Sequence, residues 1–282
     1  MTAPRSVLCA LGGTDRDGML VAIGASLADR TGSALSLLET HLELSLMGPD
    51  AVAPAPIISP QVEAETTAER ERRLQRLAGS VGHPEARCEA LPGPAQTVLS
   101  QASQRDDVAW LVAGDRGGSV LRAVLQGSVT RGLLDHAGCP VAVVTPDATT
   151  AALTDPHAVV CAVGESAGAR RTVEVAAELA GALDTTLVVV HAVDDDGGPR
   201  QSVDPLLGEL LSQVPAGVPA RGVAVTGSPV DALVDALHEE HAGVVVTGAP
   251  GRGLLRAALG GSVPHTLLGR LDRQIAVVVP DH

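Results

Sequence analysis

Two glycine-rich stretches have the residue types and the spacing that could hold a phosphate group. The first is Gly114-Asp115-Arg116-Gly117, which is followed by nine residues and then by Gly127-Ser128. The second is Gly248-Ala249-Pro250-Gly251, again with nine residues before Gly261-Ser262. Glycine lets a backbone approach a ligand closely, and a serine at the start of a helix leaves N–H groups free to face an anion. The repeated spacing therefore predicts a phosphate-binding loop that occurs twice.

Glycine pairs also occur where a chain only has to turn tightly, and either pair alone would favour that structural interpretation. The shared spacing favours binding for the first copy, which has Arg116 between its glycines. The second copy has Pro250 at that place, which lacks both the positive charge and the backbone N–H donor. For the second stretch, binding and a purely structural role stay open as equal alternatives.

Each glycine stretch lies between an apolar run and an amphipathic segment, which indicates a strand, a loop and a helix. The amphipathic segments are residues 129–137 and 263–271. The same alternation of strand and helix runs through the whole chain. The predicted strands are residues 6–11, 34–38, 86–91, 108–113 and 141–145 in the first half, and 158–163, 187–190, 244–246 and 275–279 in the second.

The spacing of apolar residues also predicts the helices between these strands. The first carries Met19, Ile23 and Leu27 on its buried side and ends before Gly32. The helix at 61–78 has Glu69 four residues before Arg73, a pair typical of a solvated face. Four prolines make residues 47–60 a loop. Further helices are predicted at 95–104, 206–214 and 230–237.

This pattern is an internal duplication. Val7 corresponds to Val159, 152 residues later, whereas Gly114 corresponds to Gly248, 134 residues later, so the second copy is 18 residues shorter. We predict a first domain at 1–146, a linker at 147–156 and a second domain at 157–282. The fold class is α/β, with two tandem Rossmann-like domains, each a five-stranded parallel sheet of order 3-2-1-4-5 with helices on both faces.

In such sheets, ligands bind beyond the carboxyl ends of the strands, where the strand order reverses. The loop that starts at Gly12 then faces the first glycine stretch, and residues 164–166 face the second. Both predicted phosphate loops would therefore lie at this edge of their sheets.

Composition narrows the classes of partner. The net charge is −13 and no stretch is rich in basic residues, which argues against nucleic acid or an anionic membrane as a partner. No window has the length and apolar character of a membrane span, and the first residues lack the pattern of a signal peptide. We therefore expect a cytoplasmic protein.

Other residues that could do chemistry have simpler explanations. Cys9 and Cys161 occupy equivalent places in two apolar strands, and Trp110 lies inside a third, so all three are expected in the core. His238 and His241 flank two glutamates at the end of a helix, which resembles a metal pair but is more typical of a solvated face. Neither Ser128 nor Ser262 lies in a nucleophile motif or has an identifiable base.

At this point the residues resemble the universal stress protein family, in particular its members with two domains in one chain. The spacing Gly-x2-Gly-x9-Gly-Ser occurs in both halves, and Cys139-Pro140-Val141-Ala142-Val143-Val144 closes the first half as in that family. The resemblance implies an adenine nucleotide alpha hydrolase-like fold. It also implies binding of ATP, with or without Mg²⁺, or of another adenine nucleotide, without a Walker lysine.

The resemblance also assigns roles to the residues of the two loops. Gly114, Arg116 and Gly117 would line the phosphates and the ribose, and the start of the next helix would donate N–H groups. The family has an aspartate after its first strand, but this chain has Gly12 there in the first copy and Gly164 in the second. The nucleotide is therefore expected more in the first domain. The candidate binding residues are Gly12, Gly114, Arg116, Gly117, Gly127, Ser128, Val129, Gly248, Gly251, Gly261, Ser262 and Val263.

The resemblance implies a stress-response regulator or sensor rather than a dedicated enzyme. An alternative is a scaffold of the same fold that no longer binds nucleotide and acts through protein–protein contacts, and a third possibility is slow ATP hydrolysis, for which no base is visible. The fifth strands, residues 141–144 and 275–279, are apolar edges that need covering. Tandem members pair these edges, so an intrachain pseudo-dimer is expected here, and a homodimer is a further option.

Overall fold

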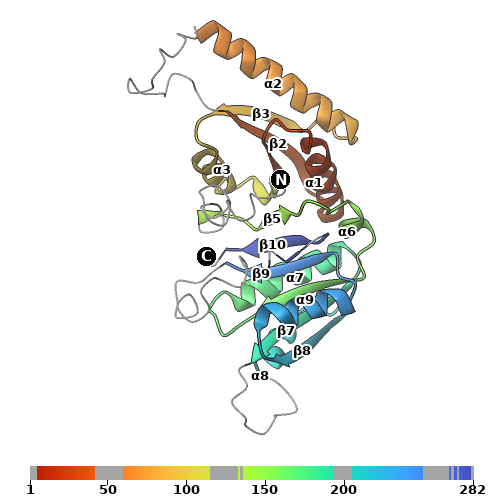
Figure 1. The fold of residues 1–282 in the computed structure, drawn as a ribbon. Coiled ribbons are helices and arrows are strands. Elements are labelled where there is room, and N and C mark those ends of the chain that lie inside the picture. Colours follow the sequence, from red (N-terminus) through yellow and green to blue (C-terminus); the bar gives the residue numbers. More distant parts are fainter. Residues whose placement is uncertain are drawn as a thin grey trace. The chain divides into compact units, whose positions relative to one another are not determined.

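The computed structural model describes residues 5–41, 60–114, 136–193, 205–249 and 273–280, together with residues 133, 267, 270 and 271. Residues 60–65 are described as backbone only. The chain divides into two compact units, residues 1–114 and 115–282, coloured red to yellow and green to blue in Figure 1. Each unit is considered by itself below. Most of the predicted loop at 47–60 lies outside the described residues, as do most residues of the predicted helices at 129–137 and 263–271.

Unit 1 is built on a parallel sheet. Strand β1 (Ser6–Leu11) pairs with β2 (Ala34–His41) on one side and with β4 (Val108–Gly114) on the other. Strand β3 (Arg87–Pro92) pairs with the outer side of β2. Long apolar runs favour such strands because both faces of a parallel sheet are buried. The predicted order 3-2-1-4 is therefore present in this unit.

Three helices accompany these strands: α1 (Asp17–Thr31), α2 (Pro60–Ser80) and α3 (Ala95–Ser103). Helix α1 ends as predicted, because Gly32 takes a left-handed conformation with φ of 63°. Two of the three residues predicted on its buried side are confirmed, and the third is not. Leu20, Ile23 and Leu27 are buried, whereas Met19 is only partly so. The helix packs along β1, β2 and β4.

Unit 2 repeats the four-stranded order of unit 1 and adds two strands, β10 (Ile275–Val279) and β5 (Val141–Val144). Its parallel order is β8 (Ala220–Thr226), β7 (Thr186–Val193), β6 (Ala158–Val163), β9 (Val244–Gly248) and β10, which is the predicted order 3-2-1-4-5. Strand β5 runs antiparallel to β10, with Val144 opposite Ile275. The predicted pairing of the two fifth strands is therefore present, and it covers the free edge of β10.

The helices of unit 2 are α7 (Ala169–Ala182), α8 (Pro205–Leu211) and α9 (Pro229–Glu239). Ser228 caps α9 by accepting a hydrogen bond from the backbone N–H of Asp231. The predicted linker contains a short helix, α6 (Ala151–Thr154), in which Ala152 and Leu153 are buried. No described helix is both long enough and apolar enough to cross a membrane.

The core of both units consists of aliphatic side chains, since the sequence has no Phe or Tyr. Trp110 is 3% exposed in β4, as predicted. Cys9 and Cys161 are fully buried in β1 and β6, also as predicted. Burial raises the pKa of Cys9 to about 12 and raises that of Cys161 as well. These thiols therefore stay protonated and unreactive in the folded chain.

Substitution of Gly243 by alanine is expected to lower the free energy of unfolding of unit 2 by about 2 kcal/mol. A Cβ atom on Gly243 would lie 2.5 Å from the backbone oxygen of Ala152, so α6 would have to move away from the start of β9. Hydrogen exchange of the β9 amides measures this loss. Gly208→Ala is the control, because a Cβ there meets nothing within 4 Å. Unchanged protection in Gly243→Ala would show that α6 is not held at this position.

Candidate functional site

The described residues contain the start of each predicted phosphate loop. Gly12 and Gly114 follow β1 and β4, which are parallel neighbours with Ala10 opposite Ala113. Gly248 ends β9, the parallel neighbour of β6. Both loop starts therefore lie at the carboxyl edge of their sheets, as expected. The other candidate binding residues lie outside the described part of the chain: Arg116, Gly117, Gly127, Ser128, Val129, Gly251, Gly261, Ser262 and Val263.

The first glycine of each stretch also has a packing role. A Cβ atom on Gly114 would lie 2.8 Å from both terminal carbons of Leu20 in α1. A Cβ atom on Gly248 would lie 3.1 Å from the hydroxyl of Thr172 in α7. Leu20 and Thr172 are 152 residues apart, the offset between the copies. A side chain at either position would press on the helix that follows the first strand of its copy.

The loop after β1 is held by Asp17, a residue that the sequence-based prediction missed. Its carboxylate accepts hydrogen bonds from the backbone N–H groups of Gly13, at 3.0 Å, and Gly12, at 3.4 Å, and from the hydroxyl of Thr14, at 3.1 Å. Asp17 is 1% exposed, whereas Asp15 in the same loop is exposed. An acidic residue in the first turn of a predicted helix was the available signal.

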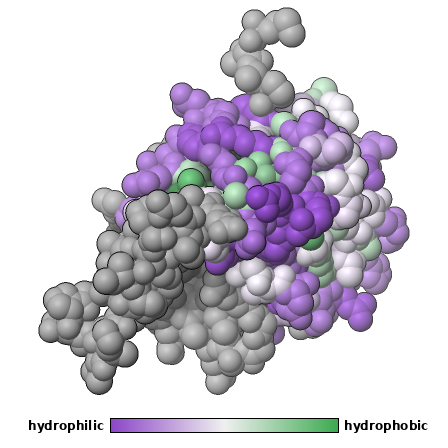
Figure 2. Space-filling view, turned by 90° about the horizontal axis from the view of Figure 1, so that it is seen from above, coloured by the Kyte–Doolittle hydropathy of each residue, from purple (hydrophilic) through white to green (hydrophobic). Residues whose placement is uncertain are grey.

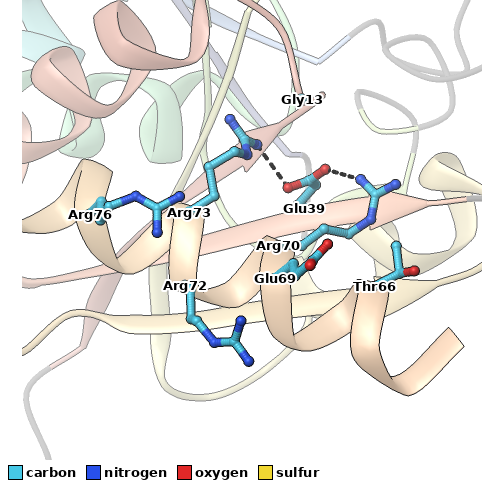
Figure 3. A pocket seen from close by; sticks show the side chains of 8 residues that line it. All are labelled: Gly13, Glu39, Thr66, Glu69, Arg70, Arg72, Arg73 and Arg76. Atoms are coloured by element: carbon cyan, nitrogen blue, oxygen red, sulfur yellow. Dashed lines mark hydrogen bonds and ion pairs between the residues drawn. The ribbon is translucent and has the colours of Figure 1, made fainter. Parts of the chain in front are cut away.

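Asp17 belongs to a network of part-buried ion pairs that joins α1, β2 and α2. Arg73 donates to Asp17 at 2.9 Å. Arg73 also donates to Glu39 at 2.8 Å, and Arg70 donates to the other oxygen of Glu39 (Figure 3). Glu39 is 1% exposed. Although partial burial lowers the pKa of Arg73, its hydrogen bonds to Glu39 and Asp17 raise that pKa above its ordinary value. The expected pairing of Arg73 with Glu69 on a solvated face is therefore wrong.

Above this network lies a cavity of about 510 Å³. Gly13 lines it from the loop after β1, Glu39 from β2, and the remaining residues come from α2 (Figure 3). Gly13 has φ of 71°, and a Cβ atom there would lie 3.1 Å from a carboxylate oxygen of Glu39. A side chain at position 13 would thus be strained and would press on the network. The lining residues on α2 are Thr66, Glu69, Arg70, Arg72, Arg73 and Arg76.

The described part of unit 2 has other residues at the corresponding places. The counterpart of Asp17 is Ala169, and the counterpart of Glu39 is His191 at the same place in β7. Helix α8 contains no arginine. Comparing the two copies along the sequence does not explain the difference, because Glu39 is buried with two cationic partners on a helix that has diverged in the second copy.

Among the described residues, no group of three or more His, Cys, Asp or Glu side chains could hold a metal ion. His241 has a left-handed backbone, with φ of 48°, and its ring packs against that of His157 at a centroid distance of 5.8 Å. His241 therefore lies just beyond α9 beside another histidine ring.

The chain matches the model of the universal stress protein family twice, over residues 4–145 and 156–278. It is 29% identical over 207 residues to universal stress protein Rv2623 of Mycobacterium tuberculosis strain H37Rv and equally to MT2698 of strain CDC 1551 / Oshkosh. The aligned region covers 69% of this chain and 68% of each relative.

Solved structures share the fold at low sequence identity. A universal stress protein from Archaeoglobus fulgidus DSM 4304 superposes with a TM-score of 0.71 at 18% identity, over 98% of this chain and 97% of that one. A functionally unknown protein, PA1789 of Pseudomonas aeruginosa PAO1, gives a TM-score of 0.62 at 17% identity, over 99% of this chain and 93% of that one. Both likenesses extend over nearly the whole chain.

Proposed function

Since the chain belongs to the universal stress protein family and contains two of its domains in tandem, we propose that it binds ATP or another adenine nucleotide. It would act as a regulator or sensor in a stress response rather than as a dedicated enzyme. One observation carries the proposal. Both copies have the spacing Gly-x2-Gly-x9-Gly-Ser, and each spacing starts at the carboxyl end of the strand beside the first strand of its copy.

In the proposed complex, the phosphates lie on the glycine stretch and on the start of the helix that follows Gly127 or Gly261. One helix terminus stabilises an anion by only about 0.3 to 2 kcal/mol, whereas micromolar affinity requires about 8 kcal/mol. Several N–H donors and contacts to the base must supply the rest. We assign the stronger site to the first domain because Arg116 adds a cation there, whereas Pro250 removes a donor in the second. Mg²⁺ would accompany ATP on its phosphates.

We further propose that the fifth strands organise the two domains as an intrachain pseudo-dimer. The antiparallel pairing of β5 with β10 supports this organisation. The hydroxyl of Thr145 adds to this strand pairing by donating a hydrogen bond to the backbone oxygen of Gln274, 2.8 Å away. A homodimer remains a further form of assembly for this chain.

A second candidate function is a scaffold that has kept the fold without binding nucleotide. The contacts of Asp17 favour it, because they engage the N–H groups of Gly12 and Gly13 that would otherwise face a ligand. The usual aspartate is also absent after the first strand of both copies. Binding measurements separate this candidate from the first.

Thermal unfolding with ATP and Mg²⁺ tests the proposal. Nucleotide at ten times its dissociation constant is expected to stabilise the protein by about 1.4 kcal/mol. Gly127→Val should abolish the shift if the first domain binds, and Gly261→Val if the second does. Gly208→Val is the control, since a Cβ atom there meets nothing within 4 Å. No shift at millimolar ATP, together with no nucleotide released from the denatured purified protein, would favour the scaffold.

A further inference from the structure

We propose that α2 and the loop after β1 form a second binding site, for a small anion that carries phosphate groups. The site is the cavity above the network of Asp17, Glu39, Arg70 and Arg73, with Arg72 and Arg76 on its wall (Figure 3). It goes beyond the proposed nucleotide site because its donors lie on α2 and not on the glycine stretches. Helix α8, which follows the second strand of unit 2 as α2 follows that of unit 1, has no arginine within its described bounds.

The first argument is charge. Four of the 20 basic residues of a chain with net charge −13 lie within seven positions of α2. The cavity and its network contain four guanidinium groups and three carboxylates, those of Asp17, Glu39 and Glu69, which leaves one positive charge. Figure 2 looks onto the side on which α2 lies in Figure 1, and hydrophilic residues cover most of its coloured surface. A local excess of positive charge on an acidic protein selects for anions.

The second argument is that several guanidinium groups have N–H donors without a partner among the described residues. Arg70 and Arg73 are held by carboxylates, yet Nε of Arg70 is buried and has no hydrogen-bond partner among the described residues. Arg72 and Arg76 are exposed and make no ion pair with any described residue. A guanidinium carries N–H donors in a planar fork that matches phosphate oxygens. An anion in the cavity would therefore meet a buried donor without a partner and two unengaged cations.

The third argument is size and shape. A cavity of about 510 Å³ falls within the range of small-molecule sites and exceeds the needs of a single inorganic phosphate. Its floor is rigid, because Asp17 and Glu39 fix Arg70 and Arg73 from below. The ligand class is thus a compact anion with more than one phosphate group, either free or attached to a nucleoside.

Calorimetric titration with inorganic pyrophosphate, in 0.15 M NaCl, tests the site. The double variant Arg72→Ala/Arg76→Ala is expected to bind pyrophosphate about ten-fold more weakly or worse than the unaltered protein. Neither residue takes part in the buried network, so the fold should be retained. Arg170→Ala/Arg171→Ala is the matched control, because it removes two exposed arginines from α7, where they pair with Glu209 and Glu174. The control should bind as the unaltered protein does.

If both double variants bind pyrophosphate equally weakly, the binding is due to net charge and the proposed site is wrong. Unchanged pyrophosphate binding in Arg72→Ala/Arg76→Ala would also contradict the site. Gly127→Val and Gly261→Val separate this inference from the proposed function. Both variants should retain pyrophosphate binding, and loss of binding in either would place the anion on a glycine stretch instead.

Titration with ATP in the presence of saturating pyrophosphate distinguishes the two ligand sources. If pyrophosphate weakens ATP binding in the unaltered protein but not in Arg72→Ala/Arg76→Ala, nucleotide phosphates occupy this site. If saturating pyrophosphate leaves ATP binding by the unaltered protein unchanged, the occupant is the free anion.

Discussion

Asp17→Ala is expected to lower the free energy of unfolding of unit 1 by about 3 kcal/mol. The side chain is 2% exposed and accepts from two backbone N–H groups, a hydroxyl and the guanidinium of Arg73. Removing it leaves two backbone N–H groups and a hydroxyl of the loop after β1 without their acceptor, while Arg73 keeps its bond to Glu39. One buried carboxylate serves several donors at once, which is why the expected loss is large for one residue.

Trp110 provides a probe for this loss. It is the single tryptophan of the chain and lies buried in β4 of unit 1, so its fluorescence during urea unfolding reports on that unit. Asp15→Ala is the matched control, because Asp15 lies in the same loop but is exposed, and its effect should stay within about 0.5 kcal/mol. A double-mutant cycle with Arg73→Met should show coupling of about 1 kcal/mol or more. Similar losses in Asp15→Ala and Asp17→Ala would mean that the loop sequence, and not this carboxylate, sets the stability.

The regular elements of the fold could be predicted because their signal is local. Strand β6 was predicted to the residue, since a continuous apolar run bounded by polar residues fits a buried parallel strand. The end of α1 was predicted from Gly32 alone. The buried side of α1 was predicted correctly at Ile23 and Leu27, but Met19 was taken in place of Leu20, because residues 19–21 are all apolar and the pattern cannot choose among them. The contact of Leu20 with Gly114 decides it, and that contact joins distant parts of the chain.

The network in the candidate site could not be predicted for the same reason. Arg73 is 56 residues from Asp17 and 34 from Glu39, so no local spacing connects them. Within α2, the nearest acidic partner by helical spacing is Glu69, which is why the helix was interpreted as solvated. The arrangement of β1, β2 and α2 brings the three charges together instead. Local periodicity thus predicts elements, whereas a buried charge cluster depends on how the elements pack.

The two copies have therefore diverged at the edge where a ligand is expected. Unit 1 has fixed the loop after its first strand with a carboxylate and two arginines, whereas unit 2 has Ala169 and His191 at the corresponding places. Both copies keep the glycine spacing, whereas the acidic residues of the ion-pair network are present in the first copy alone. The two features therefore change independently of each other. A tandem protein of this kind can keep one feature in both domains while specialising the other in one.

Raising the pH from 8 to 11 is expected to lower the free energy of unfolding of unit 1 by about 3 kcal/mol through Cys9 alone. Burial raises the pKa of this thiol from 9.0 to about 12. Above pH 9 the unfolded chain therefore loses a proton that the folded chain keeps. Stability is full below the unfolded pKa and falls as the pH rises toward the folded one, by about 1.4 kcal/mol for each pH unit.

The composition makes this alkaline window easy to interpret. The sequence contains no tyrosine and no lysine, so few other side chains titrate between pH 9 and 12. Urea unfolding followed by Trp110 fluorescence at several pH values measures the slope in unit 1. Cys9→Ala should remove most of it, while Cys88, which is partly exposed and whose pKa burial raises to about 11, contributes a smaller part in both proteins. Identical pH profiles for Cys9→Ala and the unaltered protein would show that the Cys9 thiol ionises without unfolding, and hence that water reaches this part of the core.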